Sequence, residues 1–321
     1  MLDRSTRIFV AGHRGLAGSA IHRCLQKSEF TQILTRSRSE LDLTNQAATQ
    51  KFFASEKPQA VVLAAAKVGG ILANYEFSAD FIQENLSIQN NVMGAAFCTG
   101  VQDLIFLGSS CIYPRDCLQP IKEQYLLDGP LEPTNRAYAV AKIAGIEACW
   151  AHNRQHGTRY IAVMPTNLYG PGDNYDLETS HVLPALIRKF HEAKERKLRE
   201  VSVWGTGSAW REFMYSDDLA EACLYLIDCP VDRLQPLFNK HQPPLINVGS
   251  GVELQIRELA SKVIKVVGYN GTIKWDRSRP DGTPRKLLDS SLISGFGWKA
   301  STQLDQGIGL AYDDFLSRYG S

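Results

Sequence analysis

The sequence predicts an α/β fold in which a doubly wound parallel sheet is joined to a second, smaller α/β domain. Short apolar runs at 7–11, 60–64, 104–107 and 160–164 are typical of strands buried on both faces of a sheet. Amphipathic or alanine-rich stretches of helical periodicity separate these runs. Strands and helices that alternate in this order form parallel sheets with right-handed crossovers.

Three glycines follow the first predicted strand where a helix begins. Gly12, Gly15 and Gly18 recur every three residues, and the helix continues through Leu25. Glycines in this context let the backbone approach a pyrophosphate, which binds to the free amides at the helix N-terminus. The spacing therefore predicts a dinucleotide site, with a plain tight turn as the alternative.

The charges after the second predicted strand, at 32–35, indicate which dinucleotide binds. Arg36 and Arg38 follow this strand, and Arg14 lies in the glycine loop. An NAD site usually places a carboxylate here for the ribose 2′-hydroxyl, whereas arginines bind a 2′-phosphate through forked hydrogen bonds. We expect NADP(H), with a basic surface loop as the alternative.

Polar residues follow a third strand end, and a second pair lies on a helix. Ser109, Ser110 and Cys111 come after the strand at 104–107, where open α/β sheets bind their ligands. Tyr138 and Lys142 are four residues apart in an alanine-rich helical stretch, so their side chains share one face. A nearby ammonium favours the phenolate, which suits a tyrosine that hands a proton to an alkoxide. Alone, the pair is better explained as part of a solvated helix face.

Taken together, the glycine triplet, Ser109 and the Tyr138–Lys142 pair make the chain resemble the extended short-chain dehydrogenase/reductase family. The resemblance implies a Rossmann-type fold, with Tyr138 as proton donor, Ser109 holding the substrate carbonyl, and Lys142 binding the nicotinamide ribose. The residues that we expect to contact the cofactor are Gly12, His13, Arg14, Gly15, Leu16, Ala17, Gly18, Arg38, Asp42, Leu43, Ala64, Ala65, Ala66, Leu107, Gly108, Ser109, Ser110, Lys142, Pro165, Thr166, Asn167, Leu168 and His181.

A narrower resemblance covers nearly the whole chain. It is to the NADPH-dependent 3,5-epimerase-4-reductases of this family, which act on GDP-4-keto-6-deoxy-D-mannose, and it includes residues 107–114, 164–171 and 280–289. The resemblance implies Cys111 as the base and His181 as the acid of the epimerisation, and both groups can titrate near working pH. Related 4,6-dehydratases carry Asp-Glu where this chain has Cys111-Ile112. An inert buried cysteine and a structural histidine are the alternatives.

The second half supplies candidate contacts for the nucleotide sugar. The resemblance implies Lys189, Trp204, Arg211 and Asp281 in this role. A guanidinium suits phosphate oxygens, and an indole can cover a base or a ribose. The alternatives are core packing for Trp204, a surface ion pair for Arg211, and a turn-stabilising carboxylate for Asp281.

The domain division follows from the change to shorter, interrupted elements. We expect an NADP-binding Rossmann domain over 1–164, with a returning segment near 212–250, and a mainly substrate-binding domain over 165–321. A strand at 245–249 should return to the main sheet. The proline-rich stretch at 229–244 is interpreted as a surface excursion.

Composition excludes several classes of protein. The 321 residues carry a net charge of +1, so no global field recruits nucleic acid or an anionic membrane. We expect neither a signal peptide nor a membrane span, because residues 1–7 lack an apolar core and the apolar run at 60–66 is too short to cross a bilayer. Seven cysteines without paired metal-ligand spacing predict reduced thiols and no metal site. We expect a cytoplasmic protein, and the family resemblance implies a homodimer in which the long helices at 80–100 and 137–156 pair.

Two other functions remain open from the sequence. The first is another nucleotide-sugar 4-epimerase or dehydratase of the same family. The second is a non-catalytic module that senses a dinucleotide. Such a module could lose Tyr138 or Lys142 freely, and both are present.

Overall fold

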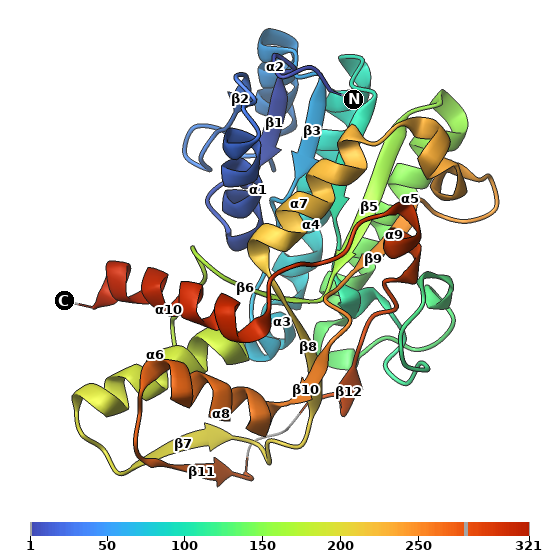
Figure 1. Cartoon of the computed structure of the whole chain (residues 1–321). Helices are drawn as coiled ribbons and strands as arrows, with labels where there is room; N and C mark the ends of the chain where they lie inside the picture. The colour runs from blue at the N-terminus through green and yellow to red at the C-terminus, as the bar shows by residue number, and fades with distance from the viewer. Residues whose placement is uncertain (1, 279–281, 321) are drawn as a thin grey trace.

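The fold is built on a six-stranded parallel sheet with the order β2-β1-β3-β4-β5-β9 (Figure 1). A computed structural model describes residues 2–278 and 282–320. The strands are β1 Ile8–Ala11, β2 Ile33–Leu34, β3 Ala60–Leu63, β4 Asp103–Leu107, β5 Arg159–Pro165 and β9 Leu245–Val248. The predicted doubly wound parallel sheet is confirmed.

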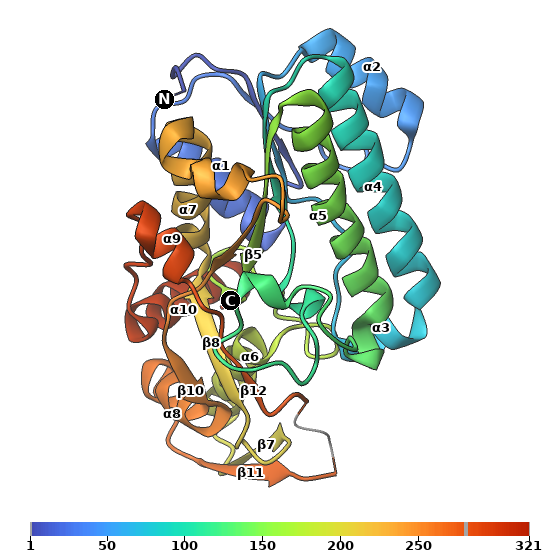
Figure 2. The same cartoon turned by 90° about the vertical axis from the view of Figure 1, so that its right-hand side faces the viewer.

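Helices cover both faces of this sheet (Figure 2). One face carries α1 Leu16–Lys27 and α7 Ser216–Asp228, and the other carries α2 Gln46–Glu56, α4 Ser78–Cys98 and α5 Arg136–His156. Successive strand residues point to opposite faces, so Val62 and Ile105 belong to one buried cluster and Val61 and Leu104 to the other. Because both faces are buried, the strands are apolar throughout rather than alternating with polar residues.

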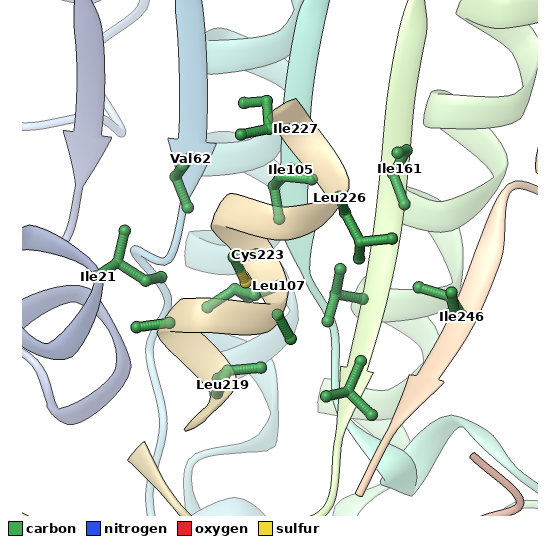
Figure 3. Close-up of a cluster of buried hydrophobic side chains, with 14 of the residues drawn as sticks. Ile21, Val62, Ile105, Leu107, Ile161, Leu219, Cys223, Leu226, Ile227 and Ile246 are labelled. Atoms are coloured by element: carbon green, nitrogen blue, oxygen red, sulfur yellow. The ribbon is translucent and has the colours of Figure 1, made fainter. Parts of the chain in front are cut away.

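The helix α7 shows how the first of these faces is filled. Figure 3 shows α7 over the strands, where Leu219, Cys223 and Leu226 belong to one buried cluster with Ile105 and Ile161 of the sheet. All five side chains are at most 3% exposed. The helix belongs to the second half of the chain but packs on the sheet of the first.

The second region lies below the carboxyl ends of the main strands in Figure 1. One small sheet contains β6 Asn167–Tyr169, β8 Trp210–Tyr215, β10 Glu253–Gln255 and β12 Arg285–Lys286, and β7 Glu200–Trp204 pairs with β11 Thr272–Asp276. The helices here are α6 Val182–Glu195, α8 Ile256–Val267 and α10 Leu304–Tyr319, and the shorter α3 Ile71–Glu76 and α9 Ser291–Phe296 complete the set of α-helices among the described residues. A third buried cluster, which includes Phe190 and Leu259, fills this region.

One buried carboxylate joins the two regions. Glu212 on β8 is fully buried, and it accepts hydrogen bonds from the amides of Gly251 (2.7 Å) and Leu288 (3.1 Å). Its backbone carbonyl accepts from the side chains of Thr166 (3.2 Å) and Asn167 (2.8 Å). Glu212 therefore holds together three segments of the chain, which follow β5, β9 and β12.

The return of the chain to the main sheet is as predicted, but the stretch before it is not. Strand β9 pairs with β5, which confirms the predicted strand at 245–249. The stretch at 229–244 is not merely a surface excursion, because a 3-10 helix at Val231–Phe238 inserts Leu234 and Leu237 into the main core, each 2% exposed. The two leucines are three residues apart, and because a 3-10 helix has three residues per turn, both side chains lie on the same side of it.

Asp173, in the loop after β6, is a buried acid with incomplete hydrogen bonding. It is 5% exposed; Oδ1 accepts from the amide of Asn174 (2.7 Å), and Oδ2 is buried without a hydrogen-bond partner in the described part of the chain. Burial raises the pKa of Asp173 to about 7, from 3.8. Between these two values the folded state holds a proton that the unfolded state has released, so this group lowers stability as the pH rises from 3.8 to about 7.

We therefore expect Asp173→Asn to be more stable than the parent above pH 7. The full linkage energy is about 4 kcal/mol for three pKa units, but the new amide leaves an unpaired donor, so the expected gain is ~1–3 kcal/mol. Urea unfolding at pH 5 and pH 8 measures it, with a smaller pH dependence in the variant. Asp176→Asn, at an exposed loop carboxylate, is the control and should give no gain. An unchanged pH dependence in Asp173→Asn would contradict the assignment.

Candidate active site

The glycine loop between β1 and α1 has the shape that a pyrophosphate requires. A Cβ on Gly12 (φ +88°) would lie 2.6 Å from the amide nitrogen of Ala65, and one on Gly18 would lie 2.1 Å from the carbonyl of Gly12. At Gly15 the nearest atom would be 3.6 Å away, and this residue caps α1 without a side-chain hydrogen bond. Two glycines thus allow close packing, and the third leaves the helix N-terminus open with its amides available to an anion.

A second observation also fits a bound dinucleotide. His13, inside the glycine loop, has a buried Nδ1 with no hydrogen-bond partner among residues 2–278 and 282–320. Gly108, at the end of β4, has no room for a side chain, since a Cβ would lie 1.9 Å from the methyl carbon of Met164. Most of the predicted cofactor residues lie at or after the carboxyl ends of β1, β3, β4 and β5, whereas Arg38, Asp42 and Leu43 follow β2 and His181 precedes α6.

The arginines after β2 have different environments. Arg36 turns toward α2, where it pairs with Glu56 (2.5 Å) and lies over the ring of Phe52 (5.2 Å). Arg38 has a 74% exposed side chain, and its guanidinium is 3.3 Å from Glu84 on α4. Only Arg38 of these two is therefore accessible to a ribose 2′-phosphate.

A carboxylate that the sequence analysis missed also lies after β2. Glu40 could bind a ribose 2′-hydroxyl, but it accepts hydrogen bonds from the amide (2.7 Å) and the hydroxyl (2.6 Å) of Ser37. These bonds lower the pKa of Glu40, and Arg14 and Arg36 lower it further. Both bonds go to Oε2 of Glu40, and the arginines near this carboxylate still favour NADP(H).

We expect Arg38→Ala to weaken NADPH binding more than NADH binding. A hydrogen bond to a charged group is worth ~1.5–3 kcal/mol, so the loss for NADPH should be about 10- to 100-fold. Fluorescence titration of both cofactors measures the difference. Arg36→Ala is the matched control and should not discriminate between them. An equal loss for both cofactors in Arg38→Ala would contradict the 2′-phosphate assignment.

Four other cofactor candidates form hydrogen bonds that fix the loops in which they lie. Asp42 accepts from the amide (2.9 Å) and hydroxyl (2.8 Å) of Thr44, and the carbonyl of Leu43 accepts from Asn91 on α4 (2.9 Å). Thr166 and Asn167 are tied to the carbonyl of Glu212, as described above. Their backbone positions are thus set by side chains outside the glycine loop.

Tyr138 and Lys142 lie in the first half of α5, as predicted, but their charges differ from expectation. Lys142 is 3% exposed; its Nζ donates to the carbonyl of Leu107 (2.8 Å) and lies 5.7 Å from the centre of the Tyr138 ring. Burial lowers the pKa of Lys142 to about 8. Burial and the nearby thiol of Cys111 raise the pKa of Tyr138. The expected stabilisation of the phenolate by Lys142 is therefore outweighed by burial, and Tyr138 is held as a protonated donor.

Cys111 lies beside this pair. It belongs to a 3-10 turn, Ser110–Ile112, that follows β4, and it is 7% exposed. Burial raises the pKa of its thiol, whereas Lys286, a hydrogen bond with Ser109 and the ammonium of Lys142 oppose this rise. The structure thus brings together Ser109, Cys111, Tyr138 and Lys142. The sequence analysis did not single out Lys286, whose charge also acts on the pKa of Cys111.

His181 lies at the N-cap of α6 and is exposed to solvent. Surrounding protein nevertheless lowers the pKa of its imidazole. The loop before it approaches the other half of the site, since a Cβ on Gly70 would lie 3.8 Å from the carbonyl of Thr179. The role of His181 in acid catalysis stays a prediction.

The candidate contacts for a nucleotide sugar form two groups. Lys189 donates to the carbonyl of Ser202 (3.2 Å) and lies 5.5 Å from the centre of the Trp204 ring. Trp204 is 54% exposed, which contradicts the alternative that it packs in the core. Arg211 lies opposite Lys286 in the register of β8 and β12. Asp281 lies outside the described residues.

The fold and the site define a dinucleotide-dependent enzyme of the tyrosine–lysine type that acts on a carbonyl or hydroxyl carbon. Residues 8–240 match the NAD dependent epimerase/dehydratase family, and the chain belongs to it. No helix of the described part is long and apolar enough to cross a membrane, nor do its side chains form a cluster of three or more metal ligands.

Curated relatives make the comparison more specific. The chain is 55% identical to GDP-L-fucose synthase 1 of Arabidopsis thaliana, over 98% of this chain and 95% of that one. It is 49% identical to GDP-L-fucose synthase of Escherichia coli (strain K12), over 97% and 96% of the two chains. These relatives confirm the narrower resemblance drawn from the sequence.

Solved structures share the fold over their whole length. A GDP-6-OMe-4-keto-L-xylo-heptose reductase from C. jejuni superposes with a TM-score of 0.92 at 38% identity, covering 99% of each chain. A GDP-L-fucose synthetase from Naegleria fowleri bound to NADP superposes with a TM-score of 0.89 at 27% identity, covering 100% of this chain and 96% of that one.

Proposed function

We propose that this chain is an NADP(H)-dependent GDP-L-fucose synthase. It converts GDP-4-keto-6-deoxy-D-mannose to GDP-L-fucose by epimerisation at C3 and C5 and reduction at C4. The observation that carries the proposal is the buried thiol of Cys111 beside the Tyr138–Lys142 pair. A reductase needs only the tyrosine and the lysine, whereas inversion of ring carbons needs an additional base. The identity to curated synthases over nearly the whole chain supports the same substrate.

Epimerisation begins with removal of a proton next to the C4 ketone. The Cys111 thiolate takes the proton from C3 or C5; the C–H bond breaks, an S–H bond forms, and the electron pair moves to the C4 oxygen. Hydrogen bonds from Tyr138 and Ser109 stabilise the resulting enolate. His181 then gives a proton to the opposite face of the carbon. The lowered pKa of His181 makes its imidazolium a stronger acid.

Reduction uses the same tyrosine in a second role. When bound, NADPH supplies the hydride that C4 receives. Tyr138 remains protonated because burial raises its pKa, and it donates its proton to the C4 oxygen. Lys142 lies close to the Tyr138 ring and is tethered to the carbonyl of Leu107, so its ammonium offsets the negative charge that develops on the phenolate.

Separate residues bind the phosphates of the cofactor and the nucleotide of the GDP-sugar. The amides at the start of α1 hold the pyrophosphate of the cofactor, and Arg38 holds its 2′-phosphate. Trp204, with Lys189 beside it, covers the nucleotide of the GDP-sugar substrate, and Arg211 binds its diphosphate. These assignments extend the geometry described above and are part of the proposal.

We also infer a cytoplasmic homodimer. All seven cysteines are unpaired, which suits a reducing compartment. On α4, Ile82, Leu86 and Ile88 are only half-buried, and on α5 Val140 is 38% exposed. Two such helices side by side on one face of the sheet can pair with those of a second copy (Figure 2). Light scattering of the purified protein tests this, and a monomer at micromolar concentration would contradict it.

The proposed reaction is tested by incubating the protein with NADPH and GDP-4-keto-6-deoxy-D-mannose in deuterated water. We expect consumption of NADPH and a GDP-L-fucose product that carries deuterium at C3 and C5. NADPH consumption with the original configuration at both carbons would indicate a simple C4 reductase. No consumption would favour a 4-epimerase or dehydratase that retains its cofactor.

A further inference from the structure

Glu84 on α4 joins the two loops that follow β2 and β3. Its Oε1 accepts a hydrogen bond from Nζ of Lys67 (2.5 Å), and its Oε2 accepts one from Nη2 of Arg38 (3.3 Å). The side chain of Glu84 is 24% exposed, so solvent reaches the carboxylate only in part. One carboxylate therefore binds two cations that come from different loops.

These two loops lie on either side of the glycine loop. The strand order β2-β1-β3 sets the loops after β2 and β3 beside the loop after β1, at the carboxyl edge of the sheet. Gly12 approaches the loop after β3 closely, since a Cβ there would lie 2.6 Å from the amide nitrogen of Ala65. Through Arg38, Glu84 contacts the loop after β2, which is where a dinucleotide places its ribose 2′ substituent.

The contact between Glu84 and Lys67 is firmly held. Asn85, the next residue of α4, is 2% exposed; its Oδ1 accepts from the amide of Lys67 (3.0 Å), and its Nδ2 donates to the carbonyl of Lys67 (3.0 Å). Asp80, one turn earlier on α4, also pairs with the ammonium of Lys67 (3.4 Å). Lys67 is therefore fixed beside α4 through both its backbone and its side chain.

The contact between Glu84 and Arg38 is looser. The side chain of Arg38 is 74% exposed, and the distance of 3.3 Å between its Nη2 and Oε2 of Glu84 is long for a charge-assisted hydrogen bond. Exposed ion pairs of this kind contribute little to stability. A phosphate accepts two parallel hydrogen bonds from a guanidinium, so it can displace the carboxylate from Arg38.

The charges around Arg38 bear on the two cofactors differently. Within this group of side chains, the charges of Arg38 and Lys67 are balanced by those of Glu84 and Asp80. A phosphate monoester carries about −1.5 to −2 charges at pH 7, and a carboxylate on the same guanidinium repels it. NADH lacks the 2′-phosphate, so its binding leaves the pair of Arg38 and Glu84 intact.

We propose that Glu84 is a specificity-determining residue that pairs with Arg38 before the cofactor binds and competes with the 2′-phosphate for it. The inference rests on the assignment of Arg38 to the 2′-phosphate in the proposed function. Binding of NADPH separates Arg38 from Glu84, while Lys67 stays paired with the carboxylate. Glu84 thereby reduces the preference of this protein for NADPH over NADH.

The test replaces Glu84 by glutamine, which keeps the shape of the side chain and an acceptor for Lys67 but removes the charge. We expect the dissociation constant of NADPH to fall about 2- to 5-fold, the usual effect of one exposed ion pair, and that of NADH to stay unchanged. Fluorescence titration of the purified protein without nucleotide sugar measures both constants. The matched control is Asp80→Asn, which removes the same charge from α4 beside Lys67 and should leave both constants as they are.

A double variant isolates the competition for Arg38. When Arg38→Ala is already present, Glu84→Gln should give no further gain in NADPH affinity, because no guanidinium remains for the two anions to share. A gain that persists without Arg38, or an equal gain in Asp80→Asn, would mean general repulsion of the phosphate by α4 and would overturn the inference.

The outcomes separate this inference from the assignment on which it rests. If Arg38→Ala weakens NADPH and NADH equally, the 2′-phosphate assignment fails and the inference fails with it. If Arg38→Ala weakens NADPH selectively but Glu84→Gln leaves NADPH binding unchanged or weakens it, the assignment stands. Glu84 is then a support for Arg38, and its role as a competitor is wrong.

Discussion

Replacement of Cys111 by serine is expected to abolish exchange of solvent deuterium at C3 and C5 of GDP-4-keto-6-deoxy-D-mannose. A serine hydroxyl is a much weaker acid than a thiol, so it supplies no base of comparable strength in this position, even though burial raises the pKa of the Cys111 thiol. The exchange rate should fall by about 10²- to 10⁴-fold, the usual contribution of a general base. Nuclear magnetic resonance of the sugar nucleotide in deuterated water measures it.

Two controls make the Cys111→Ser result specific. Cofactor binding should be unchanged, because Cys111 is not among the residues expected to hold NADPH. Cys117→Ser makes the same change at a half-buried thiol to which no role in the reaction is assigned, and it should retain near-normal exchange. Normal exchange in Cys111→Ser would remove Cys111 from the proposed mechanism.

Replacement of Tyr138 by phenylalanine is expected to lower the rate of reduction at C4 by about 10²- to 10⁴-fold. Burial holds this phenol protonated, so it is the group able to deliver a proton to the C4 oxygen, and phenylalanine keeps the ring while removing that proton. The edge-to-face contact with Phe81, at 6.3 Å between ring centres, should survive and keep α5 in place against α4. Single-turnover oxidation of NADPH measures the step.

The same variant should affect epimerisation less than reduction. Tyr138 shares stabilisation of the enolate with Ser109, so deuterium exchange should decline but persist. Tyr75→Phe, the same change at a 69% exposed tyrosine of α3, is the control and should leave both steps intact. A reduction rate within a few-fold of the parent in Tyr138→Phe would exclude Tyr138 as the proton donor.

Much of the fold was predictable because its signals are local. The buried parallel strands, such as Ala60–Leu63 and Asp103–Leu107, are continuous apolar runs, since helices cover both faces. The glycines of the first loop could be recognised because their spacing answers a local backbone requirement. Leu234 and Leu237 were misjudged, because prolines hid a short 3-10 helix whose burial depends on the core beneath it.

The candidate site was predictable in its members but not in its charges. Tyr138 and Lys142 share a helix face because their spacing dictates it, and Ser109 and Cys111 follow a strand end where ligands bind. Spacing carries no information on burial, so the protonated state of Tyr138 could not be foreseen. The different directions of the Arg36 and Arg38 side chains could not be foreseen either, because they depend on ion pairs with Glu56 and Glu84 in separate helices.

The sequence by itself determined the doubly wound sheet, the dinucleotide loop and the tyrosine–lysine pair. Each of these follows from periodicity, glycine spacing or residue order, which are properties of neighbouring residues. The tertiary structure decided which groups of the site are charged. Tyr138 stays protonated and the pKa of Lys142 falls because both side chains are buried, and burial depends on the distant segments that the fold packs around them.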